Sequence, residues 1–291
     1  MSKEQRCTVM LAIAALIWGF GFVAQRAAMN HMGPFTFNGI RFGLGGLSLI
    51  PVVLFIEKKG GFNKATLKAG LICGLVLFVA AALQQWGIAV TGSAAKSGFI
   101  TGLYIVLTPI LGMFVGRKTH KFVWFGAVLA TAGLYFIANP GELGLNVGIL
   151  ALLAGAVGWS LHILVIDRFV GQIKPLGFSS VQCLVCAVLS LGAAFWVEDM
   201  YFAQISAGYI PILYSALVSV CVAYTLQVIG QRYVAPAKSA IIFSLESVVG
   251  AGGEALILGA FMDVRGYIGG ALIFAGILAS QIKGRKKILR N

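Results

Sequence analysis

The sequence predicts an all-α integral membrane protein of ten transmembrane helices, arranged as two inverted five-helix repeats with both termini in the cytoplasm. Three observations lead to this prediction: a strongly apolar composition, long apolar runs, and an apolar stretch that occurs twice. Of the 291 residues, 59% are hydrophobic and only 11% are charged, whereas about a quarter of a typical soluble domain is charged. The apolar runs of about 20 residues match the length of helix that crosses a bilayer.

Ten apolar segments are long enough to be read as spanning helices. They are residues 7–29, 34–56, 66–90, 94–116, 121–138, 146–166, 175–196, 207–231, 236–258 and 264–282. The break at Asn139-Pro140-Gly141 separates a half of five spans, residues 1–140, from a second half of five spans, residues 141–291. Because five is odd, the second half is expected to enter the membrane from the opposite side, which makes the repeat an inverted one.

The net charge of +13 does not indicate a nucleic-acid ligand, because the basic residues follow the expected membrane topology. Alternate connections and the C-terminal tail from Lys283 hold most of the 22 Lys and Arg residues, and the connections between them hold Glu142, Glu198, Asp199 and Asp263. Basic loops remain in the cytoplasm. We therefore expect a multi-pass protein of a bacterial cytoplasmic membrane, with the lipid bilayer as its solvent, as a monomer or a loose dimer.

Two similar stretches show the internal duplication. Residues 94–116 read AAKSGFITGLYIVLTPILGMFVG, and residues 235–259 read APAKSAIIFSLESVVGAGGEALILG. Their alignment places Lys96 opposite Lys238 and Tyr104 opposite Glu246, 142 positions apart. Inverted repeats are typical of transporters, whose two halves rock about a site near the middle of the bilayer.

Four motifs resemble the EamA branch of the drug/metabolite transporter superfamily. Residues 15–23 (ALIWGFGFV) resemble its first helix, residues 34–42 (PFTFNGIRF) its second, and the two similar stretches its fourth and ninth. The resemblance covers nearly the whole chain. It implies ten helices around a central cavity and a secondary, alternating-access transporter, and many relatives export amino acids or similar small metabolites. The chain departs from the family where relatives often end these helices with Gly-Glu, since Gly116-Arg117 and Gly259-Ala260 stand there.

Glu246 is the principal candidate for a functional side chain. It lies eight residues past Lys238, hence about 12 Å along a helix and within the hydrocarbon. A carboxyl group at that depth is costly and should face the bundle interior or water. Since burial favours the neutral form of a carboxyl group, Glu246 could bind a substrate or a coupling proton. The alternative is a hydrogen-bonded Glu that only ties helices together.

Three basic side chains are candidates for binding an anionic group. Arg41 lies within the second span on a polar stripe with Asn38, and a guanidinium there could bind a carboxylate with two hydrogen bonds. The alternatives are that Arg41 extends outward toward the membrane surface or forms a structural ion pair with Glu254, and we favour the ion pair. Lys96 and Lys238 begin the fourth and ninth spans, where each could attract an anionic solute or simply extend toward the membrane surface.

The remaining candidates are uncharged polar and aromatic side chains within the spans. They are Trp18 and Gln25 in the first span, Gln85 in the third, Tyr104 in the fourth, Trp159 and His162 in the sixth, and Tyr224 and Gln227 in the eighth. Such a mixture suits a small amphiphilic solute, and it suits hydrogen bonds between helices equally well.

Two other classes of protein compete with the transporter. An intramembrane enzyme would need paired acids, a metal cluster or a nucleophile beside a base, and no His-Glu-x-x-His motif is present. A membrane partner or sensor without transport activity would have no soluble domain with which to signal. No metal site, cofactor or nucleotide-binding motif is expected, so a transporter of this sequence would be driven by an ion gradient or by the gradient of its solute.

Overall fold

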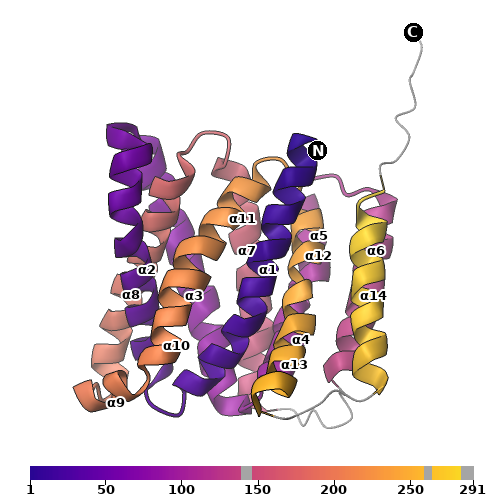
Figure 1. Ribbon diagram of the computed structural model, residues 1–291. Coiled ribbons are helices and arrows are strands. Elements are labelled where there is room, and N and C mark those ends of the chain that lie inside the picture. The colour runs from indigo at the N-terminus through magenta and orange to yellow at the C-terminus, as the bar shows by residue number, and fades with distance from the viewer. Residues whose placement is uncertain (139–145, 259–263, 283–291) are drawn as a thin grey trace.

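The computed structural model describes residues 1–138, 146–258 and 264–282, which are almost wholly helical (Figure 1). Five helices long and apolar enough to cross a membrane are unbroken: α1 (Lys3–Ala28), α2 (Pro34–Ile56), α3 (Lys64–Thr91), α7 (Val147–Phe169) and α8 (Pro175–Val197). The all-helical prediction is therefore confirmed. The predicted break at residues 139–141, the acids Glu142 and Asp263, the pair Gly259-Ala260 and the tail from Lys283 lie outside the described residues.

Three further columns are long enough to span a membrane but are interrupted. They are α4 (Ala94–Gly102) with α5 (Tyr104–Phe114); α10 (Tyr209–Leu213) with the π-helix Tyr214–Ala223 and α11 (Tyr224–Gln231); and α12 (Pro236–Phe243) with α13 (Leu245–Leu258). Two apolar helices, α6 (Lys121–Ala138) and α14 (Val264–Ser280), are shorter. The ten predicted spans coincide with these ten columns, and a membrane crossing by all ten stays a prediction.

Helices α2 and α8 form an antiparallel pair in which each helix start is capped by a carboxylate from the other. Glu198, which follows α8, accepts the Phe35 and Thr36 backbone N–H groups at 2.8 Å. Glu57, which follows α2, accepts the N–H groups at the start of α8 at 3.0 and 2.9 Å. The first N–H groups of a helix have no partner within it, and they attract negative charge. The pair is therefore tied at both ends.

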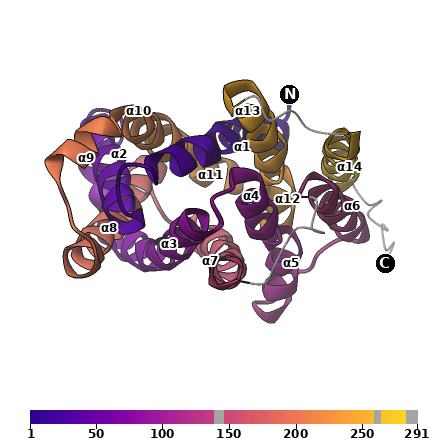
Figure 2. The same cartoon turned by 90° about the horizontal axis from the view of Figure 1, so that it is seen from below.

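Close packing joins helices of the first half of the chain to helices of the second. The most extensive contacts are α6 with α14, α2 with α8 and α3 with α7. Glycine permits the closest of these approaches, because a Cβ atom on Gly126 or Gly133 would lie 2.5 Å from a carbonyl oxygen of α14. In Figure 2, α2 and α8 lie at one end of an elongated bundle, α6 and α14 lie at the other, and the remaining long helices lie between them.

The start of α1 and the end of α14 lie at the same end of the bundle (Figure 1). This arrangement agrees with the expectation that both termini are on one side of the membrane. The assignment of that side to the cytoplasm stays a prediction, based on the basic connections.

Two of the interrupted columns are broken at similar places, which differ by one position in the alignment of the two stretches. The helix changes at Leu103 between α4 and α5, and at Ser244 between α12 and α13. In each turn a backbone N–H bonds to a carbonyl three residues earlier, from Leu103 to Ile100 and from Ser244 to Ile241. Such tightened turns mark local departures from the α-helix. Tyr104 directly follows the first break, and Glu246 lies two residues after Ser244 at the second.

Candidate solute-binding site

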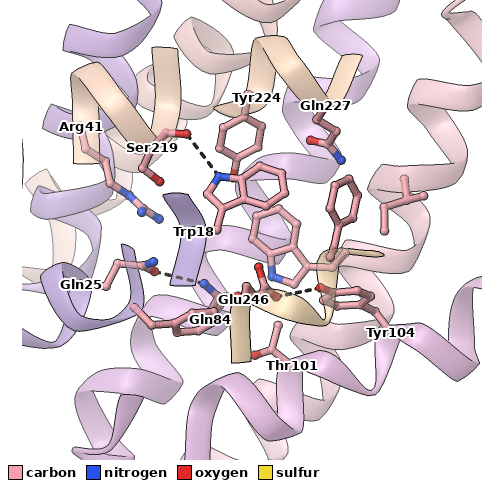
Figure 3. A pocket seen from close by; sticks show the side chains of 14 residues that line it. Trp18, Gln25, Arg41, Gln84, Thr101, Tyr104, Ser219, Tyr224, Gln227 and Glu246 are labelled. Atoms are coloured by element: carbon pink, nitrogen blue, oxygen red, sulfur yellow. Dashed lines mark hydrogen bonds between the residues drawn. The ribbon is translucent and has the colours of Figure 1, made fainter. Parts of the chain in front are cut away.

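A small cavity with a volume of about 50 Å³ lies between the two halves of the chain (Figure 3). Its walls come from α1, α2, α3 and the α4–α5 column on one side, and from α7, the π-helix, α11, α12 and α13 on the other. It is lined by Trp18, Phe22, Gln25, Arg41, Gln84, Thr101, Tyr104, Trp159, Ile163, Ser219, Tyr224, Gln227, Phe243 and Glu246. Aromatic, amide and charged groups therefore face one space.

Tyr104 and Glu246, which the alignment of the two stretches places opposite each other, meet at this cavity. The Tyr104 hydroxyl donates a hydrogen bond of 2.8 Å to Glu246 Oε1, and both side chains are buried. The sequence predicted a carboxyl group in the bundle interior at Glu246, and it lies there. One carboxyl oxygen is held by the phenol, and the carboxyl group as a whole forms part of the cavity wall (Figure 3).

Arg41 enters the same cavity from α2 and is held by neighbours that leave part of its guanidinium available. Its Nε donates to Asn38 Oδ1 at 3.0 Å, and Asn38 Nδ2 in turn donates to the Ala81 carbonyl at 3.0 Å. The guanidinium carbon lies 4.7 Å from the centre of the Phe42 ring, a distance typical of a cation–π contact. Asn38 is therefore a positioning residue behind the cavity wall.

The expected ion pair between Arg41 and Glu254 is wrong. Glu254 Oε1 instead accepts the backbone N–H of Ala94, at 3.0 Å, and so caps the start of α4. Among the described residues, no carboxylate forms an ion pair with Arg41. The reason is that Asn38 and the Phe42 ring hold the guanidinium at the cavity, while Glu254 meets the unpaired N–H groups of a nearer helix start.

The aromatic wall is assembled from both halves of the chain. The Trp18 ring lies edge-on to Tyr224 and to Phe243, with ring centres 5.2 Å apart in each case. Trp18 Nε1 donates to the Ser219 carbonyl at 3.2 Å. By contrast, Trp159 Nε1 is buried without a hydrogen-bond partner in the described part of the chain. Buried polar groups usually have a hydrogen-bond partner, so this group is suited to binding a solute.

Amide side chains form another part of the wall. Gln84 Nε2 donates to Gln25 Oε1 at 3.1 Å, and both side chains line the cavity. Gln85, the predicted residue, donates to the Gln25 backbone carbonyl at 3.3 Å and lies behind the wall. Thr101 Oγ1 and Gln227 Oε1 are buried, and neither has a hydrogen-bond partner within residues 1–138, 146–258 and 264–282. Thr101 was missed by the sequence prediction. Its position one helical turn before Tyr104 was the only signal that could have indicated it.

Three of the other predicted residues also lie outside the cavity wall. His162 packs against the ring of Trp159, and its Nε2 lies 3.0 Å from Gln182 Oε1. Lys238 forms an ion pair of 3.2 Å with Glu4 near the end of the bundle where the chain begins. Lys96 lies in the first turn of α4, partly buried and away from the cavity lining. Any solute contact by these three stays a prediction.

Comparison with known proteins identifies the family. The profile of the EamA-like transporter family matches residues 5–139 and again residues 146–280. The chain belongs to this family. It is therefore a membrane transporter of the drug/metabolite transporter superfamily, as the motifs predicted.

Relatives in the family align over most of their length. An uncharacterized transporter of Archaeoglobus fulgidus is 28% identical over 94% of this chain and 85% of its own. The uncharacterized transporter YyaM of Bacillus subtilis is 24% identical over 96% of this chain and 94% of its own. A solved crystal structure with 19% sequence identity superposes with a TM-score of 0.80 over 95% of this chain and 96% of that chain, which shows the same fold.

Proposed function

We propose that the protein is a secondary transporter that exports amino acids, or similar small metabolites, across the bacterial cytoplasmic membrane. The observation that carries this proposal is that Arg41 and Glu246 line one small cavity without forming an ion pair. An amino acid has a carboxylate for the guanidinium and an ammonium group for the carboxylate. The aromatic wall of Trp18, Trp159 and Tyr224 would contact its side chain.

Access to the cavity differs at its two ends, which supports an alternating-access mechanism. Toward the end of α1, Phe22, Ile88 and Ala94 pack together, and Arg26 Nε donates to the Gly92 carbonyl at 2.7 Å. Toward the start of α1, an open space of about 590 Å³ lies beyond the cavity. A protein that is closed at one end and open at the other is suited to exposing a solute to one side at a time.

Two inverted halves, residues 1–140 and 141–291, would perform this motion. The duplicated family match, the similar breaks before Tyr104 and Glu246, and the reciprocal caps of α2 and α8 support this arrangement. One chain encloses the cavity, so a monomer would suffice, and a loose dimer is compatible with it. The Bacillus subtilis relatives favour a bacterial cytoplasmic membrane.

Glu246 is the proposed site for a coupling proton. Its carboxyl group is buried, lines the solute cavity and can be neutralised either by a proton or by pairing with a cationic group of the solute. Competition between the two for one carboxyl group would couple proton movement to export.

Counterflow in proteoliposomes tests the transport function. Vesicles loaded with one unlabelled amino acid should accumulate the same labelled amino acid transiently, and protein-free vesicles should not. Two matched analogues sharpen the test: the amine that lacks the carboxylate and the acid that lacks the amino group should each be transported much more weakly. Equal counterflow of all three would contradict recognition by Arg41 and Glu246, and no counterflow across the amino acids would contradict the proposed substrate class.

A further inference from the structure

A second cavity, which we call the vestibule, opens at the end of the bundle where the chain begins. It has a volume of about 590 Å³ and lies among α5, α7, the end of α11 and the start of α12. Lys238 lines the vestibule and forms an ion pair with Glu4 of α1. This ion pair shows that the vestibule lies at the end of the bundle where α1 starts. The vestibule is not part of the central cavity described above.

The vestibule and the central cavity are lined by the same helices, one turn apart. Tyr104 and Gln227 line the cavity, while Thr108 and Gln231, four residues later on the same helices, line the vestibule. Residues four apart lie on one face of a helix. Between the two spaces, Gln231 Nε2 donates to the Ile163 carbonyl at 2.9 Å and so joins α11 to α7. This contact joins a residue of the vestibule lining to a residue of the cavity lining.

Two unpartnered polar groups lie at the floor of the vestibule. Thr108 is completely buried and Gln231 is 2% exposed. Thr108 Oγ1 and Gln231 Oε1 have no hydrogen-bond partner among the residues that the structure describes. A buried polar oxygen without a partner is unfavourable, and both oxygens belong to residues that face a space large enough for a small solute. Both can accept a hydrogen bond from an ammonium group.

The rim of the vestibule is mainly basic. Arg117, Lys118, Arg232 and Lys238 line it, and Asp167 is the acidic residue among the lining side chains. Asp167 forms an ion pair with Arg117. The lining therefore carries an excess of positive charge, and a recess with an excess of one charge concentrates solutes of the opposite sign. The rim is therefore suited to the carboxylate end of a solute whose ammonium group lies at the floor.

We propose that the floor of the vestibule is an entry subsite, where Thr108 and Gln231 bind the ammonium end of an amino acid before it reaches the central cavity. The basic rim holds its carboxylate. Separation of Gln231 from the Ile163 carbonyl then opens the route toward Tyr104 and Glu246. This inference rests on the proposed function and adds a second binding step on one side of the membrane.

The subsite predicts an effect that depends on the side from which the solute arrives. In proteoliposomes of one orientation, the concentration of an amino acid is varied first on the vestibule side and then on the opposite side. Thr108→Val and Gln231→Leu should each raise the half-saturating concentration about 3- to 10-fold from the vestibule side, the effect of losing one hydrogen bond. From the opposite side the value should change less than about 2-fold.

Two matched variants separate binding from damage to the fold. Thr108→Ser retains the hydroxyl group and should restore the wild-type value. Thr225→Val makes the same change on α11, where the hydroxyl bonds to the Cys221 carbonyl and lines neither space, and it should leave both sides unaltered. Suppose that the wild-type protein transports the amino acid. If the half-saturating concentration of Thr108→Val and Gln231→Leu then changed equally from both sides, or from neither side, the subsite alone would be overturned. Absence of transport by the wild-type protein would overturn the proposed function and the subsite together.

Discussion

The two interrupted columns that meet at the cavity, α4–α5 and α12–α13, have matching shapes and different chemistry. The first column is broken at Leu103, one residue before Tyr104, and the second at Ser244, two residues before Glu246. The two side chains meet in a hydrogen bond of 2.8 Å. Two carboxylates at these positions would repel each other, and two phenols would provide no strong anion. The duplicated columns bring aligned positions together at the cavity. Because the residues there differ, Tyr104 supplies a hydrogen-bond donor and Glu246 an acceptor.

The same comparison accounts for the difference between the two ends of the route. Glu254 of α13 caps the start of α4 at the closed end. The aligned position of α5, 142 residues earlier, is Gly112, which lines the open vestibule. A carboxylate thus ties two helices together at one end, while glycine leaves space at the other. Divergence between aligned positions therefore distinguishes a closed end from an open one.

The largest effect is expected from removing the carboxyl group of Glu246, which has no counterpart at Tyr104 in the first column. Glu246→Gln preserves the shape and an acceptor for Tyr104 but cannot ionise, so transport should fall roughly 100-fold, as expected for losing a hydrogen bond to a charged group. A pH gradient should also no longer alter any residual transport. Initial rates in proteoliposomes measure both effects.

Glu254→Gln is the matched control, because it changes the same side chain on the same helix outside the cavity. Its transport should remain within a few-fold of wild type. Unchanged pH dependence in Glu246→Gln would exclude this residue as the proton-coupling site.

The next largest effect concerns α2 and α8, which carry different groups at aligned positions. Arg41 of α2 aligns with Gln182 of α8, 141 residues later, and Gln182 bonds to His162 behind the wall. Arg41→Gln makes the two helices alike and should raise the half-saturating concentration of an amino acid roughly 30-fold. Transport of the matching amine, which has no carboxylate, should change little. An equal loss for both solutes would show that Arg41 acts through the fold instead.

A smaller effect is expected from the phenol of the first column. Tyr104→Phe keeps the ring and removes the donor to Glu246, so transport should fall about 5-fold. Tyr135→Phe, on the exposed face of α6, is the control and should behave as wild type. If Tyr104→Phe abolished transport as completely as Glu246→Gln, the two columns would contribute equally, contrary to the comparison.

The smallest effect is expected where the two halves carry the same side chain with the same role. Glu57→Gln and Glu198→Gln each weaken one of the two reciprocal caps of α2 and α8. Each should lower the free energy of unfolding by about 1 kcal/mol, with nearly equal shifts in the temperature of thermal unfolding in detergent. A strong loss in one variant and none in the other would show that the two caps are not equivalent.

The sequence alone determined the helices, the membrane environment, the internal similarity and the presence of the ionisable side chains Glu246 and Arg41 within the spans. The reason is that the length of an apolar run and the cost of an ionisable group in lipid are local properties. The family was also recognisable from short motifs, because they recur in order along the chain.

Tertiary structure decided which polar side chains meet. In helices that are apolar on every side, periodicity does not show which face meets a neighbour. The sequence therefore named Gln85 as a candidate, whereas the adjacent Gln84 lines the cavity. It also favoured an ion pair between Arg41 and Glu254, whereas Asn38 holds Arg41. The bond from Tyr104 to Glu246 and the vestibule beyond it depend on how the two halves of the chain pack, and residue spacing within either half does not contain that information.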